Sequence, residues 1–155
     1  MRLISIPGKL SILILMVAFS FSCKEKNGTS AKVEPILPPL PAEELKYLLI
    51  NGEATDFIFH NLPFSVSQSD RESVRNTISG FGMDPVFENP CPSIGRVFIQ
   101  VKGEIVLEAE IHFNGNECNN YIFYKNGKAT YAGNIRNNSI EFYKELMKSA
   151  ESRGK

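Results

Sequence analysis

The chain has 155 residues, of which 43% are hydrophobic and 11 are phenylalanine, and its 17 basic and 17 acidic side chains balance. This length fits one folded domain with an N-terminal extension. The apolar content is enough for a hydrophobic core, which excludes a disordered chain. The balanced charge excludes strong attraction to nucleic acid or to anionic lipid surfaces, so we expect no nucleic-acid partner.

Residues 1–22 have the pattern of a secretory signal peptide. Arg2 and Lys9 supply its positive region, residues 12–19 its apolar region, and small residues lie near its end. The apolar run is too short to span a bilayer. Its removal takes Arg2 and Lys9 from the 17 basic residues and leaves 15 against 17 acidic ones, a formal charge of −2.

Cys23 follows directly, in the stretch FSFSCKEK. A signal segment that ends at a cysteine resembles the bacterial lipoprotein family, in which a diacylglyceryl group is attached to the cysteine that becomes the mature N-terminus. The resemblance covers residues 1–26. The family usually has a branched aliphatic residue three positions before the cysteine and small residues at the next two, and of Ser20, Phe21 and Ser22 only the last fits this pattern. Cleavage by ordinary signal peptidase, which requires small residues three and one before the cut, is the alternative.

The chain has three cysteines, an odd number, and exported proteins rarely keep an unpaired thiol. Cys91 and Cys118 lie in the part expected to fold, so we predict a disulfide between them and a lipid on Cys23. The alternative is that Cys91 and Cys118 are small buried hydrophobic residues. The first interpretation places the protein in the bacterial cell envelope, anchored to a membrane on its periplasmic or surface side.

Residues 23–41 mix charge, glycine, serine and four prolines without a periodic pattern. This composition predicts a lipid-anchored tether, flexible near the anchor and stiffer toward its proline-rich end. A PxxP docking site for a partner is the functional alternative. A single α+β domain is expected over residues 42–155.

Three helices are predicted in this domain. Residues 42–50 follow a proline, carry two glutamates in the first turn and precede a glycine, as helices often do. Ser69 and Glu72 form a capping box that predicts a second helix, ending at Gly80. After Asn138, apolar residues at helical spacing predict a third.

The segment 56–66, between the first two helices, has no clear pattern. Its aromatic and branched residues are too apolar for a free loop, whereas Pro63 interrupts any strand. We expect this segment to pack on the core.

Period-two alternation between the last two helices predicts strands. Asn126-Gly127 is the strongest hairpin signal, because both central residues of a type I′ turn need positive φ, and Asn114-Gly115 is a second. Taking both as two-residue turns predicts one apolar face, which a slip of one residue would destroy. The predicted cross-strand pairs are Ile111 with Cys118, Leu107 with Ile122, Ile105 with Tyr124, Tyr124 with Ala129, Ile122 with Tyr131, and Cys118 with Ile135.

A further strand, residues 96–101, precedes these. A three-residue connection over residues 102–104 would put its apolar residues on the same face as Ile105 and Leu107, and we favour it over a two-residue turn. The predicted fold class is α+β, a four-stranded antiparallel meander packed on one face by helices before and after it. This layout is similar to the cystatin and nuclear-transport-factor-like architectures, a likeness that does not identify a function.

The opposite face of the meander carries the candidate site. Glu108, Glu110 and His112 alternate along one strand and project together. The neighbouring strand is expected to add Asn119 and Tyr121, the latter opposite Glu108. Such a row suits a metal or an acid and base pair. However, neighbouring same-face residues on a strand stand about 7 Å apart, which is long for shared coordination, so we favour a solvated outer face.

The sequence contains no motif for catalysis or cofactor binding. Cys-x-x-Cys, a phosphate-binding glycine loop, His-Glu-x-x-His and Gly-x-Ser-x-Gly are all absent. His112 has Glu117 as an alternative partner, directly opposite it in the proposed hairpin, and His60 is expected in a loop or packing position. We predict no catalytic residue, no metal site and no cofactor. We therefore favour the interpretation that the protein is not an enzyme.

The expected function is therefore binding or assembly by a lipid-anchored envelope domain, through the mixed outer face or an exposed edge strand. Its partners would be the membrane, through the lipid, and another envelope protein. Two alternatives stay open. One is a small metal-dependent ligand binder or enzyme built on the Glu108, Glu110 and His112 row, and the other is an inhibitor of an envelope enzyme.

Overall fold

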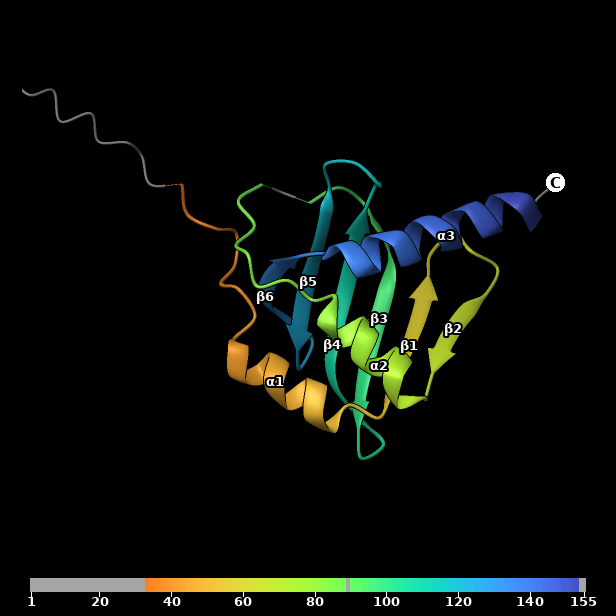
Figure 1. Cartoon of the computed structure of the whole chain (residues 1–155). Coiled ribbons are helices and arrows are strands. Elements are labelled where there is room, and N and C mark those ends of the chain that lie inside the picture. The colour runs from red at the N-terminus through yellow and green to blue at the C-terminus, as the bar shows by residue number, and fades with distance from the viewer. Residues whose placement is uncertain (1–32, 89, 154–155) are drawn as a thin grey trace, which may run out of the picture. The chain divides into compact units, whose positions relative to one another are not determined.

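The computed structural model of the chain describes residues 33–88 and 90–153 (Figure 1). The predicted signal peptide, residues 1–22, and Cys23 lie outside the described residues. In chain order the helices and strands are α1 (Ala42–Asn51), β1 (Ala54–Phe59), β2 (Ser65–Gln68), α2 (Arg71–Ser79), β3 (Ser93–Val101), β4 (Glu104–Phe113), β5 (Asn119–Lys125), β6 (Lys128–Asn134) and α3 (Asn137–Arg153).

The strands form one antiparallel sheet of six strands in the order β2-β1-β3-β4-β5-β6. The predicted four-stranded meander is therefore wrong in its strand number, although the α+β class is correct. The two additional strands come from the segment with no clear pattern. Pro63 lies between β1 and β2 instead of inside either strand, so its missing N–H group removes no ladder hydrogen bond.

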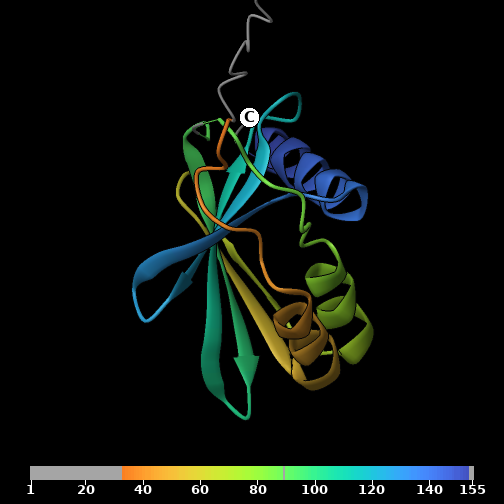
Figure 2. The ribbon, with the colours of Figure 1, turned by 90° about the vertical axis from the view of Figure 1, so that its left-hand side faces the viewer.

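All three helices cover the same face of this sheet (Figure 2). Each strand turns alternate side chains toward them, as Leu107, Ala109 and Ile111 do in β4. The core between the layers is rich in aromatic rings. Its buried aromatic residues are Phe57, Phe59, Phe81, Phe113, Tyr121, Phe123 and Tyr143. We call the face toward the helices the covered face and the opposite one the outer face.

The N-cap of helix α2 lies one residue later than predicted, at Asp70 instead of Ser69. The side chain of Asp70 accepts a hydrogen bond from the backbone N–H of Ser73 at 2.9 Å, so Asp70 is the N-cap and Ser69 is not. This hydrogen bond lowers the pKa of the exposed Asp70 carboxyl. The expectation of a Ser69 and Glu72 box is thus corrected, because a carboxylate occupies the capping position.

The hairpin between β4 and β5 has a longer loop than predicted. The side chain of Asn114 accepts hydrogen bonds from the backbone N–H groups of Asn116 and Cys118, which closes a loop over residues 114–118. Ile111 therefore lies opposite Tyr121 and not opposite Cys118. A shift by an odd number of residues exchanges the two faces of β5. The residues of β5 predicted to face outward thus face the helices.

The hairpin between β5 and β6 has the predicted Asn126-Gly127 turn, with φ of 52° and 73°. Tyr124 lies opposite Ala129 as predicted. An irregularity in the ladder then shifts the register, so Ile122 faces Ala132 and not Tyr131. The predicted pairing of Cys118 with Ile135 is also wrong, because Ile135 donates its backbone N–H to the carbonyl of Asn119.

The connection between β3 and β4 is a two-residue turn and not the predicted three-residue one. Lys102 and Gly103 both have positive φ, and Val101 pairs with Glu104. A register shift between Ile99 and Gln100 brings Ile99 opposite Leu107 on the covered face, as expected from their apolar character. Ile105 is left exposed outside the core.

Residues 33–40 pass over the outer face and around β6 (Figure 2). We call them the strap. Ile36 and Leu37 pack with Ile122 and Ala132 of the outer face and with Val86 from the segment between α2 and β3, whereas Leu40 is buried in the main core. Between them, the carbonyl of Pro38 accepts a hydrogen bond from the N–H of Ala132 in β6 at 2.9 Å. Residues 36–40 thus belong to the folded domain, although the sequence placed them in the tether.

Two tyrosines share a hydrogen bond inside the core. The hydroxyl groups of Tyr121 and Tyr143 lie 2.8 Å apart, and both side chains are fully buried. Desolvation raises the pKa of Tyr121 to about 12, although the hydrogen bonds to Tyr143 and Ser139 act in the opposite direction. Desolvation, together with the neighbouring Tyr121, raises the pKa of Tyr143 well above its usual value.

These raised pKa values predict a loss of stability in alkali. A raised pKa in the folded state gives stability that is fully present below pH 10, the usual value, and that is lost as the pH rises toward about 12. Urea unfolding at increasing pH would measure this loss. It should be smaller in Tyr143→Phe and unchanged in Tyr47→Phe, which alters an exposed tyrosine of α1. An equal loss in both variants would contradict the buried pair.

Candidate functional site

The outer face carries a cluster of charged and aromatic side chains from three adjacent strands. Glu108, Glu110 and His112 of β4 all lie on this face, as the sequence predicted. Arg96 of β3 lies opposite Glu110, and Tyr124 of β5 lies opposite Glu108. We call these five residues the outer cluster.

The carboxylates of the outer cluster are held by Arg96 and Tyr124. The Arg96 guanidinium donates to Glu108, and its second nitrogen lies 3.8 Å from Glu110 Oε1. The Tyr124 hydroxyl donates to Glu110 Oε2 at 2.9 Å. The guanidinium also lies 5.6 Å from the centre of the Tyr124 ring, a cation–π distance. Two carboxylates thus share one arginine, which leaves the cluster acidic.

The environment of Tyr124 favours its protonated phenol, which donates a hydrogen bond to Glu110. Desolvation, followed by the hydrogen bond to Glu110 and the negative charge of that carboxylate, raises the pKa of the Tyr124 phenol. A neutral phenol keeps its proton pointed at Glu110. This contact therefore fixes the orientation of a carboxylate at the centre of the outer face.

His112 is nearly buried and is oriented by the backbone. Its Nδ1 contacts the carbonyl of Cys91, and because a carbonyl only accepts, Nδ1 carries the hydrogen. Its Nε2 lies 3.6 Å from Glu110 Oε2 and has no hydrogen-bond partner within the described residues. The predicted alternative partner Glu117 is wrong, since the residue opposite His112 in β5 is Asn120.

The predicted disulfide between Cys91 and Cys118 is confirmed. The two Cα atoms are 6.0 Å apart, and the bond joins the segment before β3 to the loop after β4. The same segment supplies the carbonyl that orients His112. The disulfide thus supports one end of the outer cluster.

Two of the predicted surface residues do not belong to this site. Tyr121 lies opposite Ile111 and is fully buried on the covered face, beside the ring of Phe81. Asn119 lies opposite Phe113, at the end of the same row. Both were assigned to the outer face through the two-residue turn at Asn114, and the longer loop overturns that assignment.

The sequence also missed two members of the outer cluster. Arg96 precedes the buried Val97 in a strand, and this alternation is the signal that could have placed it on the outer face. Tyr124 could not be assigned without the register of β5.

The His60 side chain, predicted in a loop or packing position, lies outside the outer cluster. It is exposed and lies 3.3 Å from the hydroxyl of Ser93.

The acidic groups of the outer cluster have partners within the cluster. Within residues 33–88 and 90–153, no three His, Cys, Asp or Glu side chains are placed to hold a metal ion. The carboxylates of Glu108 and Glu110 are already engaged by an arginine and a phenol.

A hollow of about 370 Å³ lies at the far end of the cluster, where β4 and β5 separate. Its lining includes the cluster residues Glu108 and Tyr124.

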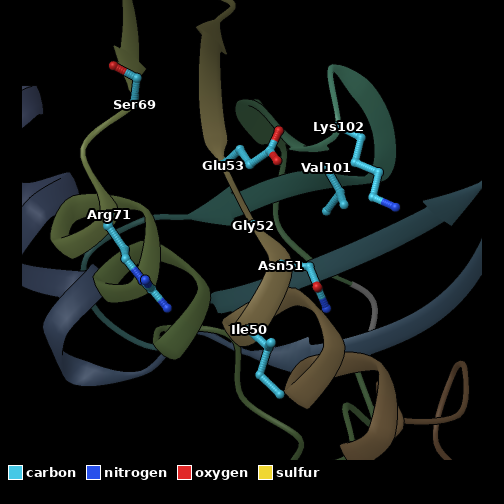
Figure 3. A pocket seen from close by; sticks show the side chains of 8 residues that line it. All are labelled: Ile50, Asn51, Gly52, Glu53, Ser69, Arg71, Val101 and Lys102. Carbon is cyan, nitrogen blue, oxygen red and sulfur yellow. The ribbon is translucent and has the colours of Figure 1, made fainter.

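A second hollow, of about 440 Å³, lies between the end of α1, the start of α2 and the turn after β3 (Figure 3). It is lined by Ile50, Asn51, Gly52, Glu53, Ser69, Arg71, Val101 and Lys102. Its charged side chains, Glu53, Arg71 and Lys102, point in different directions in Figure 3 and do not converge on a common point. This hollow therefore lacks the converging polar groups of a ligand site.

No helix in the described part of the chain is both long and apolar enough to cross a membrane. Comparison with protein-family models, with curated proteins and with solved structures gives no match. The function must therefore be inferred from the residues and geometry of this chain.

Proposed function

We propose that the protein is a cell-envelope domain, anchored through a lipid on Cys23, that binds or assembles with another envelope protein. The observation that carries this proposal is the Cys91–Cys118 disulfide. Stable disulfides are typical of exported proteins. With two of the three cysteines paired, Cys23 remains by count, at the end of a segment with the pattern of an export signal.

The strap supports a function close to the membrane. Ten residue steps lead from Cys23 to Val33, where the described domain begins, and an extended chain of this length spans at most about 35 Å. Because residues 36–40 pack on the domain, they do not extend this reach. The domain would then act near the surface of its own membrane.

The outer face supports binding more than catalysis. It presents an acidic cluster whose groups are held by one another, with aromatic and polar side chains beside them. Such mixed surfaces are common in protein interfaces. The partner would be a protein, and the membrane would be reached through the lipid.

Substitution of the lipidated cysteine tests this proposal. In cells, the wild-type protein should fractionate with membranes, and Cys23→Ser should be exported but recovered in the soluble envelope fraction, because one acyl-bearing residue supplies the anchor. Ser30→Ala, a change in the same segment, is the matched control and should stay with membranes. Recovery of Cys23→Ser with membranes would contradict the lipid anchor. A soluble wild-type protein would favour ordinary signal-peptidase cleavage.

A further inference from the structure

The strap lies beside a second irregular segment along the edge of the sheet. The backbone N–H of Ile36 donates to the carbonyl of Val86 at 2.9 Å. The segment 82–88 is in turn fixed to β6, because Gly82 donates to the carbonyl of Asn134 at 2.8 Å. The strap and this segment therefore lie side by side at the β6 edge (Figures 1 and 2).

Three large apolar side chains on these two segments face solvent. Val33 is 67% exposed, Phe87 48% and Met83 37%. Their neighbours Ile36 and Val86 point inward and pack on the outer face, so the exposed set is separate from the core. The hydrogen bond between Ile36 and Val86 brings the two segments that carry them side by side, and exposed apolar residues on neighbouring segments are candidates for an interaction site.

The backbone under this surface is held in place. A Cβ atom added at Gly82 would lie 1.7 Å from Asn134 Oδ1, and one added at Gly133 would lie 2.1 Å from the carbonyl oxygen of Gly82. Only glycine allows so close an approach between the segment and β6. The exposed side chains are thus presented by a rigid base, which lowers the entropic cost of binding.

Each of the three apolar residues has an acidic neighbour in the sequence. Glu34, Asp84 and Glu88 are all exposed, and each is adjacent in sequence to one of the three apolar residues. Residues 33–41 and 80–88 contain no lysine or arginine. We call the three apolar and three acidic residues the strap patch. It combines three large apolar side chains with three acidic ones, which we call its acidic rim, and protein interfaces likewise combine apolar residues with a polar rim.

We propose that the strap patch docks an apolar site rimmed by lysine or arginine on a protein at the membrane surface. The location of this partner rests on the proposed lipid anchor, since Cys23 is at most about 35 Å from Val33 along an extended chain. The sign of the rim follows from charge complementarity with three carboxylates. A bilayer is disfavoured as the occupant, because anionic headgroups repel an acidic rim. A second copy is disfavoured because a symmetric contact would bring the carboxylates of both patches together.

Photocrosslinking in cells tests the proposal on the full, anchored chain. Phe87 is replaced by the photoreactive p-benzoyl-phenylalanine, and the same replacement at Ile105, which is 60% exposed near the β3–β4 turn, is the positional control. The expected result is one discrete protein adduct from position 87 and none from position 105. The partner peptide in that adduct should contain lysine or arginine beside apolar residues.

Charge reversal then tests the acidic rim. Glu34→Lys, Asp84→Lys and Glu88→Lys combined should reduce the adduct at least about fivefold, because rim charges control the rate of association. Glu43→Lys, Glu104→Lys and Glu145→Lys combined change the net charge equally at exposed positions elsewhere and should leave the adduct unchanged. An equal reduction by both sets would overturn the proposal.

Other outcomes also overturn it. An adduct only with phospholipid would make the patch a membrane contact, and an adduct only with the same chain would make it a self-association surface. Adducts from position 105 but not from position 87 would leave the proposed binding function intact and refute the strap patch. Absence of an acyl group on Cys23 would refute the anchor and, with it, a partner held at the membrane surface.

Discussion

Removing the disulfide, in Cys91→Ala/Cys118→Ala, is expected to lower the free energy of unfolding by about 3.5 kcal/mol. The cysteines are 27 positions apart in the sequence, and in the chain-entropy model a loop of this size restricts the unfolded chain by about that amount. The loss should be larger if the carbonyl of Cys91 also moves away from His112. The variant therefore tests both the bond and its support of the outer cluster.

Urea denaturation of the two proteins in a Cys23→Ser background would measure this difference. Wild-type domain treated with a reductant is the matched control and should lose a similar free energy. If the oxidised protein contained two free thiols by mass, or if the variant were as stable as the parent, the disulfide would be refuted. Peptide mapping without reductant should join the peptides that contain Cys91 and Cys118.

Phe57→Ala is expected to cost about 3 to 5 kcal/mol, the range for removing a fully buried phenylalanine. The Phe57 ring lies 5.3 Å from that of Phe142 and 6.4 Å from that of Tyr143, measured between centroids. Its side chain is completely buried in the main core. The substitution would leave a cavity between β1 and α3.

The next residue along the same strand is the matched control. Ile58 points to the outer face and is 55% exposed, so Ile58→Ala should change the unfolding free energy by only about 0.5 kcal/mol. Thermal or urea unfolding of both variants would show the contrast. Similar effects at the two positions would mean that β1 is not a strand with one buried face.

The turns show what local sequence can and cannot predict. Asn126-Gly127 forms the predicted two-residue turn because asparagine and glycine both readily adopt the positive φ values that it needs. Asn114-Gly115 has the same two residue types, yet the Asn114 side chain binds backbone N–H groups further along and opens the loop to residues 114–118. One of these N–H groups belongs to Cys118, which is also held by the disulfide to Cys91.

The two strands β1 and β2 could not be found from alternation. In β1 the buried Phe57 and Phe59 are separated by the apolar Ile58, so both faces look hydrophobic in the sequence. Strand β2 has only four residues, too few for a clear period. Their place in the sheet depends on pairing with β3, which is information from distant parts of the chain.

The sequence placed correctly those residues of the candidate site that lie on a single strand, β4. Glu108, Glu110 and His112 share a face because strands alternate with period two, whatever their neighbours are. Tyr121 and Tyr124 depend on the register between β4 and β5, and the shift exchanged their faces.

The packing of the strap on the domain could not be predicted from its composition. Four prolines in residues 23–41 suggested an extended tether, whereas burial of Leu40 against the core is a tertiary contact that no local pattern indicates.

The mass of the N-terminal peptide from membrane-extracted protein tests the central claim most directly. The lipid anchor predicts a peptide that begins at Cys23 and carries a diacylglyceryl group. A peptide that begins at Cys23 with an unmodified thiol would instead indicate ordinary signal-peptidase cleavage after Ser22, and it would contradict the anchored function proposed for the domain.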